Sequence, residues 1–230
     1  MRVIAVILAL SAACGALAVP ASGGRPATKQ QAEAFVSAVN LRAGDVPGFK
    51  GSTEHATETA AEKRLEQEML HCAGWAGFGS GIAEGSSQSF KRETGKVALG
   101  VSSSVSVARS SAMAAKELAA MRSGRTKGCL SHYLDQLFKS QKDQGATFSP
   151  ATVIAVAPPA PGTSGSFGWV IAMTITLHRV ALPVYLEILG FTNGPAEVTL
   201  FTSSLPTPFP AAVEHRLFSL LVERARTHPV

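Results

Sequence analysis

The sequence predicts an α+β fold, a largely antiparallel sheet of about six strands with helices packed mainly on one face. Apolar residues alternate with polar ones in two regions, 87–107 and 167–204. The segments around them repeat their apolar residues every three or four positions, as amphipathic helices do. Short turns join most neighbouring strands, and short turns favour antiparallel pairing.

The N-terminal half is expected to contain two helices and a hairpin. Thr28 can cap a helix that runs to about Asn40, and a second helix begins near Ala60. A hairpin follows, with strands at 87–92 and 97–107 joined by a turn at Thr94-Gly95.

The C-terminal half is expected to contain three helices and four strands. A helix capped by Ser110 or Ser111 ends at Gly124, and another covers 127–142. A strand at 152–157 precedes three strand-like runs between Phe167 and Ser204, and the last helix ends near Arg226.

The turn at 192–195 gives a specific prediction of register. Aliphatic residues occupy even positions on both sides of this turn, which favours an odd-length loop with Thr192 opposite Ala196. One buried face would then carry four aliphatic side chains, namely Leu186, Ile188, Val198 and Leu200.

The N-terminus has the features of an export signal. Arg2 precedes an apolar stretch at 3–10, which is too short for a stable membrane anchor, and Ala16-Leu17-Ala18 fits a signal-peptidase site. The alternative is lipidation at Cys14, because residues 11–15 resemble a bacterial lipobox whose usual leucine is displaced by one position, to Leu10. We expect residues 1–18 to be a signal, 19–27 a flexible tether and 28–230 a single domain.

Two cysteines remain after processing, Cys72 and Cys129, whether Cys14 is removed or lipidated. Because export supplies an oxidising compartment, this pair predicts one disulfide. The alternative is two buried free thiols that pack as small hydrophobic side chains. The spacing matches no zinc or redox motif.

The charge balance argues against a nucleic-acid partner. The net charge is +5 over 230 residues, a mild basic excess. A local group of basic residues could attract an acidic membrane or wall polymer, but such runs are more often solvated helix faces; its members are Arg109, Lys116, Arg122, Arg125 and Lys127. Any membrane association is expected through Cys14 only.

Motifs for catalysis, metals and cofactors are absent from the sequence. Gly162–Ser166 resembles a nucleophile elbow, but Ser166 replaces the final glycine. No HExxH, CxxC or phosphate-binding loop occurs, so no catalytic residue, metal ligand or cofactor is predicted. Glu187 and Glu197 could line a cleft if their strand faces are covered, and are otherwise solvated.

One further stretch supports a resemblance. Residues 41–49 read LRAGDVPGF and lie between an export signal with its first helix and a cysteine-bearing helix. A strand-rich hairpin, a helical segment with Cys129, a β-meander and a last helix follow. In this order of features, which covers most of 28–228, the chain resembles small secreted proteins and lipoproteins of actinobacteria. More loosely, it resembles the extracellular sensor domains of mycobacterial serine/threonine kinases, although it has one cysteine pair where those have two disulfides. The resemblance implies an antiparallel sheet with helices and carries over no functional residue.

The sequence is compatible with three functions. The first is an extracytoplasmic, non-catalytic binding or sensor-like module of the cell envelope, secreted or lipid-anchored, with a small ligand or envelope protein as its partner. The second is an envelope hydrolase with a dispersed site, which needs converging groups such as His178 and Glu187. The third is an assembly partner in an envelope complex, which needs an exposed apolar patch.

Overall fold

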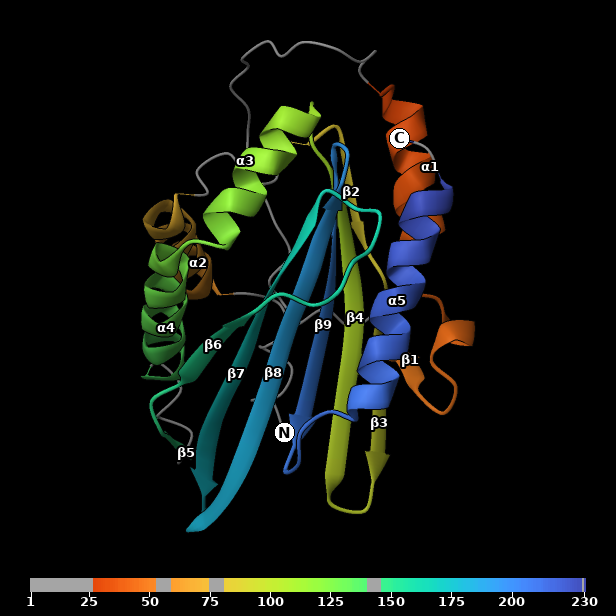
Figure 1. Cartoon of the computed structure of the whole chain (residues 1–230). Helices are drawn as coiled ribbons and strands as arrows, with labels where there is room; N and C mark the ends of the chain where they lie inside the picture. Colours follow the sequence, from red (N-terminus) through yellow and green to blue (C-terminus); the bar gives the residue numbers. More distant parts are fainter. Residues whose placement is uncertain (1–26, 53–58, 75–80, 140–145, 229) are drawn as a thin grey trace.

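The computed structural model describes residues 27–52, 59–74, 81–139, 146–228 and 230. Within them the chain forms an α+β fold with one antiparallel sheet and five α-helices (Figure 1). The predicted export signal, Cys14 and all of the predicted tether except its last residue, 27, lie outside the described residues. None of the described helices is long and apolar enough to span a membrane.

Over the described residues the sheet contains nine strands, three more than the roughly six predicted. Its main path is β1-β3-β4-β9-β8-β7-β5, while β2 pairs with β4 and β6 pairs with β7. The strands are β1 Lys50–Ser52, β2 Ala83–Ser86, β3 Ser89–Thr94, β4 Val97–Val107, β5 Ala146–Phe148, β6 Thr152–Val156, β7 Gly165–Leu177, β8 Val180–Asn193 and β9 Ala196–Leu205.

The six longer predicted strands are confirmed, and the three missed ones are β1, β2 and β5. These three contain only three or four residues each and pair at the edges of the sheet. A segment of that length has too few positions for an alternating pattern, so its neighbours rather than its sequence determine its strand conformation.

The prediction that the helices lie mainly on one face is wrong. The helices are α1 Lys29–Val39, α2 Ala60–Ala73, α3 Ser111–Met121, α4 Gly124–Lys139 and α5 Ala211–Thr227. Helices α1 and α5 pack in one core with Leu189 and Phe191 of β8, whereas α2, α3 and α4 pack in a second core with Val184 and Leu186. Alternate residues of a strand point to opposite faces, so the two cores lie on opposite sides of the sheet (Figure 1).

The predicted register at the β8–β9 turn is also wrong by one residue. Asn193 pairs with Ala196 across a two-residue turn, Gly194-Pro195, and Gly194 has φ 59°. Positive φ at the first central position is what a type II′ turn requires. Leu186 and Ile188 therefore face one core and Val198 and Leu200 the other. The prediction assumed that the even-numbered aliphatic residues of both strands share one buried face. It failed because β8 carries apolar residues on both of its faces near this turn.

Two helix starts follow their predicted caps, Thr28 and Ser110, whereas the cap at Thr59 was not predicted and α4 begins at Gly124 rather than near 127. Thr28 and Thr59 form capping boxes with Gln31 and Glu62, and the Ser110 hydroxyl accepts a hydrogen bond from the Met113 amide. Each such cap satisfies amide groups that the first helical turn leaves without partners.

The turn that follows α1 is held by α5. The Asp45 carboxylate accepts a hydrogen bond from the Arg42 amide (2.7 Å) and two from the Arg224 guanidinium (2.7 and 2.8 Å). Arg224 also donates to the Asn40 carbonyl, and Arg216 to that of Asp45. Both side chains of the ion pair are largely buried, at 13% exposure for Asp45 and 18% for Arg224. The turn after α1 is thus fastened to α5 by these side-chain contacts.

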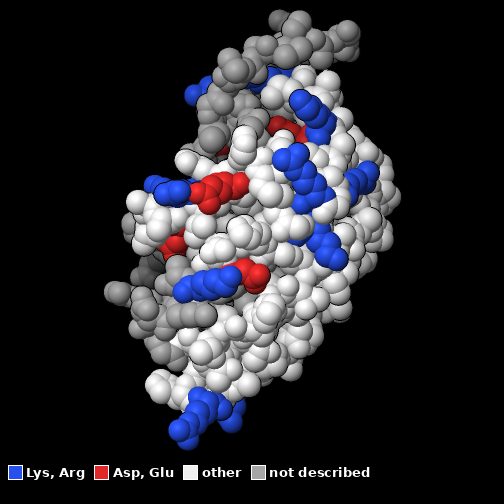
Figure 2. All heavy atoms as spheres, turned by 90° about the vertical axis from the view of Figure 1, so that its left-hand side faces the viewer, with Lys and Arg blue, Asp and Glu red and all other residues white. Residues whose placement is uncertain are grey.

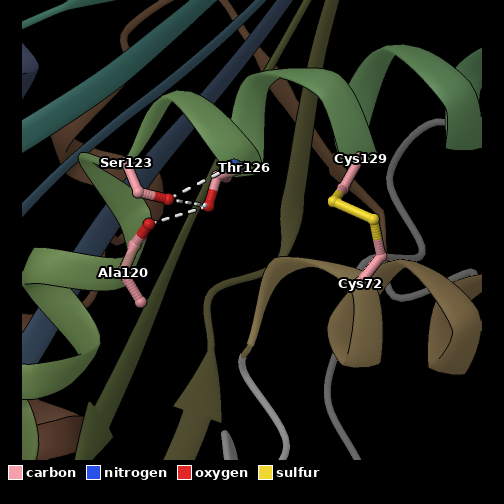
Figure 3. The surroundings of a disulfide bond; sticks show 5 residues. All are labelled: Cys72, Ala120, Ser123, Thr126 and Cys129. Atoms are coloured by element: carbon pink, nitrogen blue, oxygen red, sulfur yellow. Dashed lines mark hydrogen bonds between the residues drawn. A yellow bond between two sulfur atoms is a disulfide. The ribbon is translucent and has the colours of Figure 1, made fainter.

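A disulfide joins the two helices that carry the predicted cysteine pair. Cys72 of α2 and Cys129 of α4 have their Cα atoms 5.8 Å apart, which confirms the predicted bridge (Figure 3). In the same region the Thr126 hydroxyl donates to the Ala120 carbonyl (2.7 Å), which fixes the joint between α3 and α4. The disulfide, typical of proteins that fold outside the cytoplasm, therefore fastens α2 to the helical layer that covers β7.

Removing this disulfide should lower the free energy of unfolding. The bridge closes a loop of 57 residues, and in the chain-entropy model such a loop contributes about 4 kcal/mol. We expect the Cys72→Ala/Cys129→Ala variant to unfold at a lower urea concentration than the oxidised protein, and to match the reduced wild type. A loss below about 1 kcal/mol would contradict the assignment of this bond as a main constraint on the fold.

The Asp45–Arg224 pair should make stability depend on pH in the acid range. Burial acts to raise the pKa of Asp45, but hydrogen bonds from Arg224 and Arg42 and their charges outweigh it, so this pKa lies below its ordinary value. The stabilisation is present above about pH 4, the pKa of an unfolded Asp, and is lost as the pH falls through the lowered pKa. Asp45→Asn should cost about 1.5–3 kcal/mol at pH 7, as measured by urea unfolding.

The exposed pair Lys29–Glu33, with its atoms 3.7 Å apart, supplies the control. Glu33→Gln should change the stability by less than about 1 kcal/mol. Equal losses of unfolding free energy for Asp45→Asn and Glu33→Gln would show that the Asp45–Arg224 pair stabilises the fold no more than an exposed ion pair does.

Candidate functional site

Polar side chains from three neighbouring strands meet on one face beside the β8–β9 turn. Thr192 of β8 pairs with Glu197 of β9, which pairs in turn with Ser106 of β4. Residues paired in this way point to the same face, with neighbouring strands about 4.8 Å apart. In the next row, Thr199 lies opposite Ser104. These side chains form a compact, oxygen-rich group.

The residues at the centre of this group are buried and incompletely hydrogen-bonded. Glu197 is 6% exposed and Thr192 is fully buried. Among the described residues, neither Oε2 of Glu197 nor Oγ1 of Thr192 has a hydrogen-bond partner. Buried polar atoms without partners are uncommon in folded proteins and costly. These two lie in adjacent positions, which marks the place as a candidate site.

Helix α3 adds a second carboxyl group. Glu117 of α3 is close enough for its negative charge to act on Glu197. Burial, followed by this charge, raises the pKa of Glu197 to about 8, although a hydrogen bond from Thr199 opposes the rise. Burial also raises the pKa of Glu117 to about 7. At neutral pH this pair therefore retains at least part of a proton.

The position of α3 over this group is fixed by packing and one hydrogen bond. Ala114, Leu118 and Met121 are buried beneath the helix. At its C-terminal end the Arg122 guanidinium donates to the Ser166 carbonyl (2.7 Å), at the start of β7. Glu117 therefore lies on a rigid element rather than on a loop.

The polar group continues onto β4. Ser102, Ser104 and Ser106 alternate with the buried valines of this strand and are half-buried; we call these three residues the serine face. Among the described helices, only α1 packs closely against β4, and it lies in the core on the opposite side. The serine face is thus a small-residue polar surface that leads to Glu197.

A second carboxyl pair lies on the other face of the sheet. Glu187 of β8 is half-buried, and burial, together with the charge and a hydrogen bond of Glu214 in α5, raises its pKa to about 7. Glu214 also accepts a hydrogen bond from the Thr202 hydroxyl (2.8 Å). This pair satisfies its own hydrogen bonds and links α5 to the sheet, so we regard it as structural.

The sequence-predicted candidates are thus separated by the fold. Glu187 and Glu197 are both covered rather than solvated, but they lie on opposite faces. His178 lies exposed in the β7–β8 turn. Glu187 lies further along β8, and seven residues of this strand, 180–186, separate the two. That distance exceeds about 20 Å at 3.3 Å per residue, so the two residues form no common site.

The resemblance to a nucleophile elbow is not functional either. The Ser166 hydroxyl donates to the Pro158 carbonyl, and the Ser164 hydroxyl accepts a hydrogen bond from the Gly194 amide. Both serines therefore hold the loop against the sheet. No histidine is paired with either in the hydrogen bonds of the described residues.

The basic residues around α3 and α4 are exposed to solvent. Arg109, Lys116, Arg122, Arg125 and Lys127 all lie at the surface. Figure 2, which views the molecule from the left-hand side of Figure 1, shows several Lys and Arg side chains on one part of this face and others beside Asp or Glu side chains. This arrangement fits the interpretation of a solvated helix face.

Comparison with protein-family models and with curated proteins finds no match for this chain. Within the described segments, no three His, Cys, Asp or Glu side chains are grouped so that they could hold a metal ion. The site must therefore be interpreted from its own geometry.

Sequence reasoning found Glu197 but missed Glu117 and Thr192. Glu117 lies on the flank of an amphipathic helix, where a carboxylate is ordinarily solvated. Thr192 belongs to a turn signal in the sequence. Only the register of β8 and the position of α3 bring these residues to Glu197.

Glu197 should make the protein less stable as the pH rises. An unfolded Glu ionises near pH 4.3, whereas Glu197 in the folded chain retains its proton up to about pH 8. The folded state therefore binds more protons in this window, and stability falls with rising pH across it. Glu197→Gln should make the urea-unfolding midpoint less dependent on pH between pH 5 and pH 8, while Glu117 and Glu187, whose pKa values are raised to about 7, keep the remaining dependence.

The exposed Glu223 serves as the control for this measurement. Glu223→Gln should leave the pH profile of the wild type in place. Parallel profiles for wild type and Glu197→Gln would rule out a perturbed Glu197.

Proposed function

We propose that the protein is an extracytoplasmic, non-catalytic binding module of the bacterial cell envelope, with its site at the serine face and Glu197. The observation that supports it most is the pair of adjacent buried oxygens without partners, Glu197 Oε2 and Thr192 Oγ1. A bound group that contacts these atoms would remove the cost of leaving them unpaired. The half-buried serine face provides polar contacts beside them.

The proposed location rests on the disulfide and on the sequence. A structural disulfide favours an oxidising compartment, and residues 1–18 have the pattern of an export signal. The mature protein is then secreted, or anchored to the outer side of the cytoplasmic membrane by lipid at Cys14. The resemblance to secreted actinobacterial proteins and kinase sensor domains supports the same location and a sensor-like role.

The hydrolase alternative receives less support from the geometry. A hydrolytic site needs a nucleophile or activated water beside a positioned base. His178 and Glu187 lie far apart, and Glu187 is engaged with Glu214. The serines of 162–166 are held by backbone groups.

A ligand retained through purification tests the proposal. Native mass spectrometry of the protein from its own host should show added mass that disappears on denaturation. Ser104→Leu, which places a bulky side chain on the serine face, and Glu197→Gln should each lose this mass. Glu187→Gln, on the opposite face, should keep it. Wild-type protein without added mass, or variants that all retain it, would contradict the site.

A second candidate is an assembly partner that binds the edge strand β6. Ile154 is 53% and Val156 36% exposed, and β6 pairs only with β7 among the described strands. An exposed apolar edge can pair with a strand of another chain.

A photo-crosslinking residue at position 154 distinguishes this candidate. In the native host it should trap one specific envelope protein, whereas the same residue at the exposed position 179 should not. Equal labelling from both positions would exclude a specific partner at β6.

A further inference from the structure

We propose that β6 (Thr152–Val156) pairs antiparallel with β6 of a second copy of this chain, about a two-fold axis at Ile154. The inference rests on the proposed strand-binding role of β6 and names the partner. It follows from the free side of the strand, the exposed apolar residues beside it, its lack of charge and the symmetry of its sequence.

The outer side of β6 has no strand beside it among the described residues. There β6 pairs with β7 alone, and its backbone hydrogen bonds belong to that ladder. Helix α4 packs against one face of the strand, where Val153 is buried, and not along its outer side. An edge strand of this kind presents a row of N–H and C=O groups with which another strand can pair.

The face of β6 opposite α4 is apolar and exposed. Ile154 is 53% and Val156 36% exposed, and both point away from the face of Val153 because side chains alternate along a strand. On β7, the half-buried Val170 lies opposite Ile154. A strand placed against the outer side of β6 would remove part of this apolar surface from water, which favours association.

The edge at β6 also lacks the charges that usually keep edge strands apart. Residues 144–177 contain no Asp, Glu, Lys or Arg. At the opposite edge of the sheet, β1 has only three residues and begins with the exposed Lys50, which pairs with Lys91 of β3. Short strands and lysines are devices by which proteins block edge pairing. The fold thus protects one edge with them and leaves β6 without them.

The partner is a second copy because β6 is complementary to itself. An antiparallel pair centred on Ile154 places Ile154 opposite its counterpart, Thr152 opposite Val156, and Val153 opposite Ala155. Every pair joins uncharged side chains, and the β-branched residues meet one another on the exposed face. A two-fold contact requires such a surface, in which the same residues serve both chains.

The ends of β6 follow the same symmetry. Pro150 and Pro158 lie at equal distances from Ile154 along the chain. Proline donates no backbone hydrogen bond, so each ends a ladder. In the proposed pair Pro150 of one chain lies opposite Pro158 of the other, and both ladders end together.

The contact is small, which sets the expected affinity. A strand of five residues buries less than the roughly 1,600 Å² of a standard interface. We therefore expect a reversible dimer with a dissociation constant in the micromolar range or weaker, detectable by sedimentation equilibrium of the concentrated protein.

Cysteine crosslinking tests the register, because Ile154 is the residue of β6 that meets itself across the axis. Facing residues of antiparallel strands have Cα atoms about 4.5–5.5 Å apart, within the reach of a disulfide. With Cys14 removed or replaced by Ser, Ile154→Cys should give a covalent dimer on mild oxidation. Val156→Cys should not, because its two copies lie about 13 Å apart along the strands, but it should crosslink with Thr152→Cys when the two variants are mixed.

Val180, which is 58% exposed on β8, supplies the matched control. Val180→Cys should give no covalent dimer, and Val180→Lys should sediment as the wild type does. Ile154→Lys should weaken the dimer at least tenfold and keep the circular dichroism spectrum of the wild type, because the side chain it replaces is exposed and surface substitutions rarely unfold a protein.

A wild type that stays monomeric at about 1 mM chain would overturn the proposal. Equal crosslinking of Ile154→Cys and Val180→Cys, or a dimer unchanged by Ile154→Lys, would overturn it as well. A photo-crosslinker at position 154 that traps only a different envelope protein would overturn the self-pairing and keep the strand-binding role of β6.

The ligand-binding function is tested independently of the dimer. Ile154 shares a face of the sheet with Glu187, since Val170 pairs with both, and this face is opposite to that of Glu197. Ile154→Lys should therefore keep the ligand mass retained by the wild type. Loss of the dimer alone leaves the binding function standing, and absence of retained mass alone leaves the dimer standing.

Discussion

The structure depends on one constraint, which is that strand β8 is buried on both faces. Val184 and Leu186 belong to the core under α2, α3 and α4, while Leu189 and Phe191 belong to the core under α1 and α5. The sheet is therefore a wall shared by two helical layers. Successive residues of a strand point in opposite directions. The polar residues Thr192, Glu197 and Thr199 near the β8–β9 turn are therefore buried on one face of the sheet, the face that α3 covers.

This constraint explains what could be predicted and what could not. Strand β4 and the helix caps at Thr28 and Ser110 carry local signals, and the disulfide follows from counting thiols. The strands β1, β2 and β5 carry no local signal, because their conformation comes from their partners. The predicted register was wrong for a related reason. When a strand is apolar on both faces, its sequence does not indicate whether the odd- or the even-numbered residues face a given core. Glu197 was identified, but its neighbours Thr192 and Glu117 come together only in three dimensions.

The joint at 41–49 shows how a recognisable stretch can be structural. Leu41 and Val46 are buried, Asp45 holds both its own turn and Arg224, and Phe49 lies 6.4 Å from Phe209, with Arg92 over its ring at 4.9 Å. The contacts of Asp45 and Phe49 are thus made with Arg42, Arg224, Arg92 and Phe209, which belong to the folded domain. These contacts show that the stretch supports the fold, and the residues of the proposed binding site lie elsewhere.

The two carboxyl pairs distinguish a structural role from a binding role on physical grounds. Glu187 and Glu214 bond to each other and to Thr202, so their burial is compensated within the protein. Glu197 receives a hydrogen bond from Thr199, yet its Oε2 atom and the neighbouring Thr192 hydroxyl stay unpaired. The turn at Gly194-Pro195 fixes the register that directs Glu197 inward, beneath α3. A buried carboxyl oxygen without a partner costs stability, and this cost is the physical ground for proposing a bound group at Glu197 and none at Glu187.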